Sequence, residues 1–158
     1  MLTDFTFKDT GITIKIKKIS PMLAADVAAA MPEPEPPLNV VDYGEPRGIV
    51  TEPNYSDPSY QVAVAEHKKK MFAALQRVMI LRSVVVEGDE WRQEVKEYRE
   101  FIKSVTGKDL DEPDDLIVYI LRVCVGSEDD LTDFLTAVTR RSQPTQEAIE
   151  QAKRSFRG

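Results

Sequence analysis

Two kinds of hydrophobic period flank a proline-rich segment in this chain. The stretch FTFKDTGITIKIKKI (residues 5–19) has apolar residues two positions apart on each side of a Lys-Asp-Thr-Gly turn: Phe5 and Phe7 before it, and Ile12, Ile14 and Ile16 after it. This alternation predicts a β-hairpin with one covered face. Because a lone two-stranded hairpin is marginal in water, we expect it to pack on helices, on a third strand or on another chain.

Helical spacing and capping signals follow on both sides of the proline-rich segment. Ser20 and Pro21 predict the start of a short helix that stops before Pro32, and Asp57-Pro58 predicts the start of a long helix that ends near Arg82. The clearest apolar stripe has steps of four and three and is closed by a glycine at 107: Trp91, Val95, Tyr98, Ile102 and Val105.

The C-terminal third of the sequence predicts two further helices and one ambiguous element. Ser127 and Asp130 resemble a capping box before an amphipathic helix, and residues 145–156 form another amphipathic pattern. The apolar run DDLIVYILRVCVG leaves a buried helix and a strand both open. Val84–Val86 likewise either finish the long helix or form a brief extended piece.

The predicted fold class is mainly α (α+β). A helical domain of about five helices (59–158) follows an N-terminal β-hairpin and short helix (1–31) and an extended Pro-rich linker (32–58). The expected core consists chiefly of large apolar side chains from the helices: Trp91, Tyr98, Ile102, Leu116, Ile120, Leu121, Leu131 and Phe134.

The Pro-rich segment, residues 31–60, holds seven of the ten prolines. Because proline fixes φ and donates no backbone hydrogen bond, we expect this strap to run extended over the surface rather than to form a ladder of its own. It nevertheless keeps Tyr43, Ile49, Tyr55 and Tyr60, which a spacer does not need. These four residues are the candidate partner-binding residues, with a structural tie onto the helices as the alternative.

The net charge narrows the classes of binding partner, and the cysteine content indicates the cellular compartment. The 158-residue chain has a formal net charge of −6, so neither nucleic acid nor an anionic membrane is an expected partner. A single cysteine, the absence of a signal-peptide pattern and the lack of an apolar run of about 18 residues favour a reduced cytoplasm.

No combination of residues points to catalysis, a metal or a cofactor. His67 lies on a polar helical face without a nucleophile or an orienting partner, and the apolar neighbours of Cys124 predict a buried, unreactive thiol. The acidic groups at 111–115 and 127–130 are better explained as helix caps than as metal sites. We therefore expect a protein that is not an enzyme.

Three stretches resemble small proteins of tailed bacteriophages, in particular the tail assembly chaperones of siphophages. They are FKDTGITIKIKKISPML, the strap that ends EPNYSDPSY before a long helix, and GSEDDLTDFLTAV with SQPTQEAIEQAKRSF. The resemblance implies a non-enzymatic factor in the host cytoplasm that holds the helical tape measure protein during tail assembly.

The alternative class is a structural virion subunit of the tail or connector, whose hairpin and strap would contact neighbouring subunits. Self-association is compatible with either class. A regulatory binding module is a third possibility.

Overall fold

The computed structural model describes residues 1–142 and 153–154, and it divides the chain into two compact units. One unit, here called the sheet unit, comprises Met1–Leu23 and Gln76–Gly158, and the other, the hairpin unit, comprises Ala24–Leu75. The predicted helix over 145–156 lies outside the described residues, apart from 153–154.

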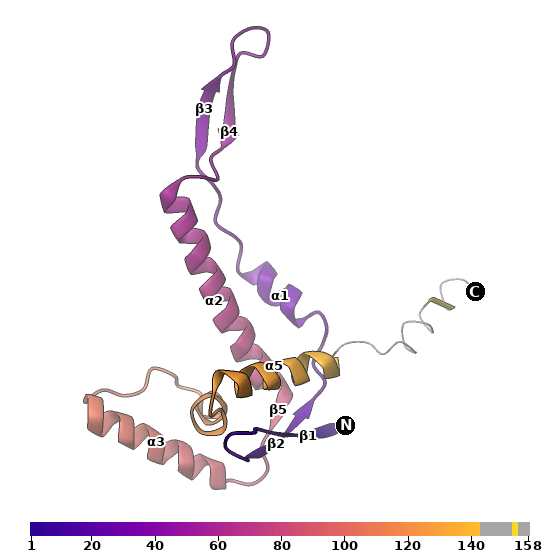
Figure 1. The fold of residues 1–158 in the computed structure, drawn as a ribbon, viewed down its shortest axis with the longest axis vertical. Helices are drawn as coiled ribbons and strands as arrows, with labels where there is room; N and C mark the ends of the chain where they lie inside the picture. Colours follow the sequence, from indigo (N-terminus) through magenta and orange to yellow (C-terminus); the bar gives the residue numbers. More distant parts are fainter. Residues whose placement is uncertain (143–152, 155–158) are drawn as a thin grey trace. The chain divides into compact units, whose positions relative to one another are not determined.

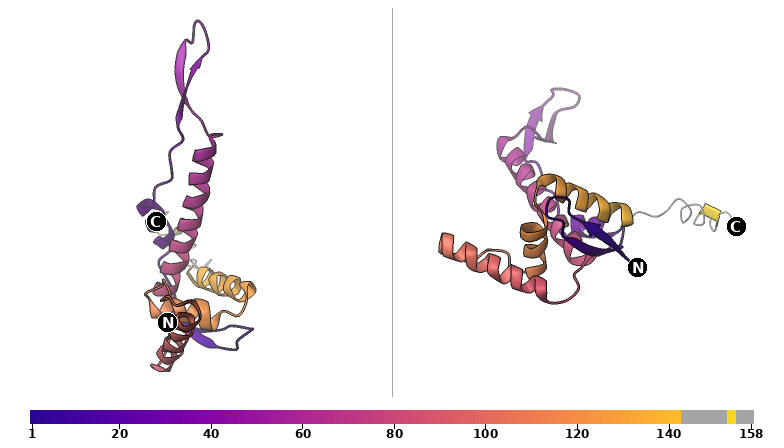
Figure 2. Two further views of the ribbon diagram at one scale, coloured as in Figure 1. Left: turned by 90° about the vertical axis from the view of Figure 1, so that its left-hand side faces the viewer. Right: turned by 60° about the horizontal axis from the view of Figure 1, so that its bottom comes forward.

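The described residues are mainly helical, as predicted, with two small antiparallel sheets (Figures 1 and 2). The helices are α1 (Leu23–Ala30), α2 (Pro58–Ser83), α3 (Glu90–Thr106), α4 (Asp115–Val118), the π-helix η1 (Tyr119–Cys124) and α5 (Glu128–Ser142). The strands are β1 (Leu2–Thr6), β2 (Thr13–Lys17), β3 (Leu38–Asp42), β4 (Ile49–Pro53) and β5 (Val84–Val85).

The N-terminal hairpin is confirmed, and a third strand supports it. Strand β1 pairs with β2 from Leu2↔Lys17 to Thr6↔Thr13, and β2 pairs on its other side with β5. Val84 and Val85 thus form a brief strand rather than the last turn of the helix, and Val86 follows outside it. Ile14 and Ile16 are each 2% exposed, so one face of the hairpin is covered, as the two-residue period predicts.

The core of the sheet unit joins this hairpin to the helices. Phe7, Phe134 and Val138 are fully buried, and the Phe7 and Phe134 rings lie 5.7 Å apart between centroids. Of the predicted core residues, Ile120 is fully buried and Phe134 is part of the same cluster. Four others are partly buried against it: Trp91, Tyr98, Leu116 and Leu121. The remaining two, Ile102 and Leu131, are only half-buried and lie outside the cluster.

The caps that the sequence predicts form at most helix ends. The Asp57 carboxylate accepts from Tyr60 N–H at 2.9 Å at the start of α2, and Gly107 ends α3 with φ 74°. Asp114 accepts from Leu116 N–H at 2.9 Å, which starts α4 and settles residues 115–124 as helical rather than extended. The short helix α1 begins at Leu23, two residues after Pro21.

One prediction about the strap is wrong. Residues 38–53 do form a ladder of their own, the antiparallel hairpin β3–β4. The prolines permit this because none needs to donate in the middle of a strand: Pro46 lies in the connecting loop and Pro53 is the last residue of β4. Pro37 precedes β3 and contributes only its carbonyl, which accepts from Asn54 N–H at 2.7 Å.

Candidate functional site: an apolar face of the second hairpin

The β3–β4 hairpin (Figure 1) is closed at both ends by backbone hydrogen bonds. At the loop, Tyr43 N–H donates to Gly48 C=O at 3.0 Å, and Gly44 and Gly48 adopt φ of 70° and 74°. Such positive φ values favour glycine, which explains its use at both positions. The register runs from Leu38↔Pro53 to Asp42↔Ile49, so residues directly opposite each other share a face.

One face of this hairpin carries three large apolar side chains that are exposed to solvent. Leu38 and Val40 alternate along β3, and Ile49 lies on β4 opposite Asp42, diagonally next to Val40. Their side chains are 66%, 72% and 70% exposed, respectively. The sequence predicted only Ile49 of these three. We call Leu38, Val40 and Ile49 the apolar hairpin face.

The opposite face is partly covered by the hairpin's own side chains, although Tyr43 itself is 45% exposed. Val41 and Val50 pair across the strands on this face and are half-buried. The Tyr43 hydroxyl donates to the Glu52 carboxylate at 2.5 Å, and the Arg47 guanidinium lies 4.2 Å from the centre of the Tyr43 ring. The hydrogen bond to Glu52 raises the pKa of Tyr43. Tyr43 therefore has a stabilising role within the hairpin.

The four predicted partner-binding residues fall into three places. Ile49 is on the apolar hairpin face, whereas Tyr43 is on the opposite face. Tyr55 and Tyr60 lie at the junction of the hairpin with α2, where their rings make an edge contact with centroids 6.1 Å apart. Tyr55 is 64% exposed and Tyr60 is half-buried. The structure does not bring all four into one site.

The hairpin unit has no buried side chain anywhere in residues 24–75. Besides the apolar hairpin face, it exposes Val62 and Phe72 of α2, which are 60% and 59% accessible. A unit without a core of its own gains little from the hydrophobic effect on folding, and an isolated two-stranded hairpin is marginal in water. Its exposed apolar side chains are the kind of surface that a binding partner covers.

The residues that the sequence analysis considered for catalysis or metal binding lie away from this face, and several of them stabilise the fold. Cys124 is fully buried, and burial raises the pKa of its thiol to about 12. His67 is half-buried on α2, and Lys68–Lys70 are exposed. Of the acidic groups, Asp114 caps α4 and Asp115 forms an ion pair with Arg99 at 2.9 Å.

Comparison with known proteins adds no family assignment. No protein-family model matches the chain, and neither a curated protein nor a solved structure is similar to it. Within the part of the chain that the structure describes, no helix combines the length and the apolar character needed to cross a membrane.

Proposed function

We propose that this chain is a non-enzymatic binding protein whose apolar hairpin face docks on the apolar stripe of a helical protein partner. The observation that carries the proposal is the hairpin unit itself: residues 24–75 bury no side chain, yet present Leu38, Val40 and Ile49 together on one side of a two-stranded ribbon. The free energy from covering these side chains is available only on binding.

A helix fits this face better than an added strand does. Leu38 and Val40 are two residues apart on one strand, so their side chains are separated by roughly 7 Å, and Ile49 extends the row diagonally. An amphipathic helix places apolar side chains at i, i+3 and i+4, about 5 to 6 Å apart, along a similar straight row. The contact is therefore between side chains and leaves both hairpin edges unused.

The phage tail assembly chaperone is the specific form of this proposal. A tape measure protein is long and helical, and its apolar stripes would aggregate unless another protein covered them until the tail tube has assembled. A small acidic protein that binds apolar stripes through an exposed two-stranded hairpin is suited to that task. The support for the phage assignment is the sequence resemblance, and the support for the binding mode is the exposed face.

The test is to look for a long, tape-measure-like helical open reading frame beside the gene for this chain and to co-express its product with this chain. We expect the helical protein to stay in solution and to co-purify with this chain, and we expect finished particles to lack the chain. If the chain is instead present in purified particles at a fixed copy number, it is a structural tail or connector subunit. If the chain binds only other copies of itself and leaves the helical protein insoluble, the proposed partner is wrong.

A further inference from the structure

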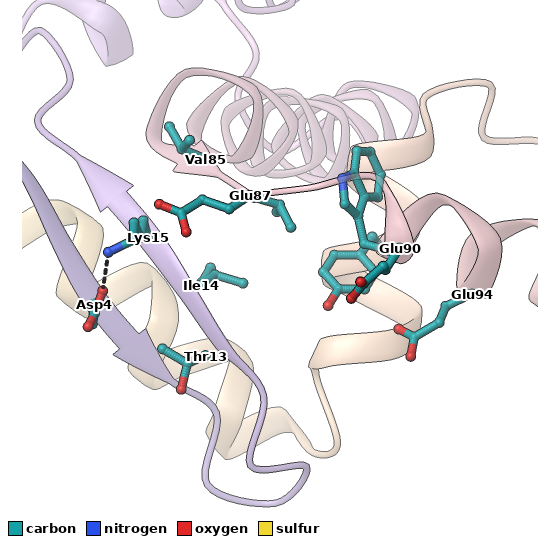
Figure 3. Close-up of a pocket in the computed structure, with 11 residues that line it drawn as sticks. Asp4, Thr13, Ile14, Lys15, Val85, Glu87, Glu90 and Glu94 are labelled. Atoms are coloured by element: carbon teal, nitrogen blue, oxygen red, sulfur yellow. Dashed lines mark hydrogen bonds and ion pairs between the residues drawn. The ribbon is translucent and has the colours of Figure 1, made fainter.

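The sheet unit contains a cavity of about 380 Å³ that is unrelated to the apolar hairpin face (Figure 3). It lies where the short strand β5 leads into α3, facing β2. Its polar lining consists of four carboxylates, one ammonium group and one hydroxyl-bearing strand residue: Asp4, Glu87, Glu90, Glu94, Lys15 and Thr13. Cavities of this size are typical of ligand sites.

The cavity exists because β5 leaves the sheet early. Strand β5 pairs with β2 only at Lys15↔Val85 and Ile16↔Val84, whereas β2 begins at Thr13. The hydrogen bond from Phe7 N–H to Ile12 C=O fixes the alternation, so the backbone groups of Ile14 face β1 and those of Thr13 face away from it. Thr13 therefore turns its N–H and C=O toward the side from which β5 has departed.

The charges around the cavity are strongly unbalanced. Lys15 already forms an ion pair, because its ammonium group lies 3.1 Å from the Asp4 carboxylate. The hydrogen bond to Asp4, together with the charge of Glu87, raises the pKa of Lys15. Glu90 and Glu94 have no ion pair among the described residues. They stand one turn apart on α3, an unfavourable arrangement for like charges that a bound cation would relieve.

Hydrophobic and aromatic side chains line the other part of the cavity. Ile14, Val85, Val86, Trp91 and Tyr119 line it, and the Trp91 and Tyr119 rings are 5.5 Å apart between centroids. Tyr119 is only 7% exposed. Its polar neighbour in the core is the Cys124 thiol, a weak hydrogen-bonding group.

We propose that this cavity binds the side chain of an arginine or lysine presented by an extended basic peptide segment of a partner protein. The aliphatic part of such a side chain matches the wall, and its cationic end matches Glu90 and Glu94. The free N–H and C=O of Thr13 match the peptide backbone. A metal ion is the poorer match, because no three His, Cys, Asp or Glu side chains in residues 1–142 and 153–154 are grouped to hold one.

Trp91 makes the proposal directly testable, because it is the only tryptophan in the chain and it lines the cavity. The full chain is titrated with an acetylated, amidated Gly-Ser-Arg-Ser-Gly peptide and with the same peptide carrying citrulline, a neutral isostere of arginine. We expect a saturable change in tryptophan emission with the arginine peptide, with a Kd of about 1 mM or tighter, and none with the citrulline peptide.

Two pairs of substitutions on α3 remove the same charge. Glu90→Gln with Glu94→Gln changes the cavity, whereas Glu97→Gln with Glu100→Gln changes exposed residues that do not line it. We expect the first pair of substitutions to weaken binding of the arginine peptide by at least about fivefold, and the second pair to change its Kd little. Circular dichroism before titration shows that both proteins are folded.

Three outcomes would overturn the proposal. They are equal binding of the citrulline peptide, equal loss with both pairs of substitutions, and no saturable change at all. Butylguanidine, which has the guanidinium and an aliphatic chain but neither a peptide backbone nor a second charge, should bind about fivefold more weakly, the value of one net hydrogen bond. Equal or tighter binding of butylguanidine would overturn the peptide assignment in favour of a small guanidinium compound.

Discussion

Replacing Asp130 by asparagine should destabilise the sheet unit, although the sequence suggests only an ordinary helix cap. The Asp130 side chain is 2% exposed, and its carboxylate accepts from Gly126 N–H at 3.0 Å and from Asp9 N–H at 3.4 Å. It thereby joins the first turn of α5 to the turn of the N-terminal hairpin. An asparagine of the same shape would present a donor in place of one acceptor oxygen.

The expected loss of unfolding free energy follows from these two hydrogen bonds. A hydrogen bond to a charged group is worth about 1.5 to 3 kcal/mol, and the long Asp9 contact adds about 0.5 kcal/mol. Removing a buried charge also relieves the cost of its desolvation, which offsets part of this loss. We therefore expect Asp130→Asn to lower the free energy of unfolding by about 2 kcal/mol net.

Urea unfolding at neutral pH measures this difference, and Asp129→Asn is the matched control. Asp129 precedes Asp130 in the first turn of α5 but is exposed, so its substitution removes the same charge near the helix N-terminus and no buried hydrogen bond. Unfolding free energies of the two variants that agree within about 0.5 kcal/mol would refute the role assigned to Asp130.

Two further predictions concern the core of the sheet unit. With its pKa near 12 and no exposed surface, Cys124 should not react with iodoacetamide at pH 8 in the native protein and should react readily in urea; fast native alkylation would contradict its burial. Phe134→Ala should cost about 3 to 5 kcal/mol, whereas Phe101→Ala, at a side chain 61% exposed, should cost less than about 0.5 kcal/mol. Similar melting temperatures for these two variants would show that the core is wrongly assigned.

The helices were predictable because their signals are local. Asp57 before Pro58 and Gly107 after the stripe of α3 each mark an end within a few residues of sequence, and both ends form as expected. The choice between helix and strand at 115–124 was harder, because two local signals oppose each other there. The β-branched residues favour a strand, whereas the Asp114 cap favours a helix, and the structure has the helix.

The β3–β4 hairpin was missed because proline content outweighed a weaker signal. LNVVD and IVTEP contain a two-residue alternation, with Leu38 and Val40 on one side of β3, but the prolines around them argued against any ladder. Whether a proline breaks a ladder depends on its position, and these lie at the ends and in the loop. The apolar hairpin face therefore became visible only with the register.

Long-range packing is the other part that the sequence could not supply. Phe7 is among the most buried side chains because the N-terminal hairpin packs on α5, more than 100 residues later in the chain. The cavity beside Trp91 likewise depends on where β5 stops pairing with β2. Neither the packing of the hairpin on α5 nor the end of the β2–β5 pairing can be predicted from the spacing of residues along one helix or strand.

The most direct test of the central claim is the affinity of the helical partner for a chain whose apolar hairpin face has been made polar. Leu38→Thr, Val40→Thr and Ile49→Thr keep strand propensity while removing the exposed apolar side chains. The control, Val62→Ala with Phe72→Ala, removes exposed apolar groups from α2 of the same unit.

Burying each of the three side chains is worth about 1 to 2 kcal/mol at their observed exposure, so calorimetry should show at least about 100-fold weaker binding for the threonine variant. Backbone chemical shifts of residues 38–53 that match those of the natural chain show that the hairpin is formed to the same extent. The control should bind within about threefold of the natural chain. Unchanged affinity of the threonine variant with the hairpin intact would contradict the proposed binding surface.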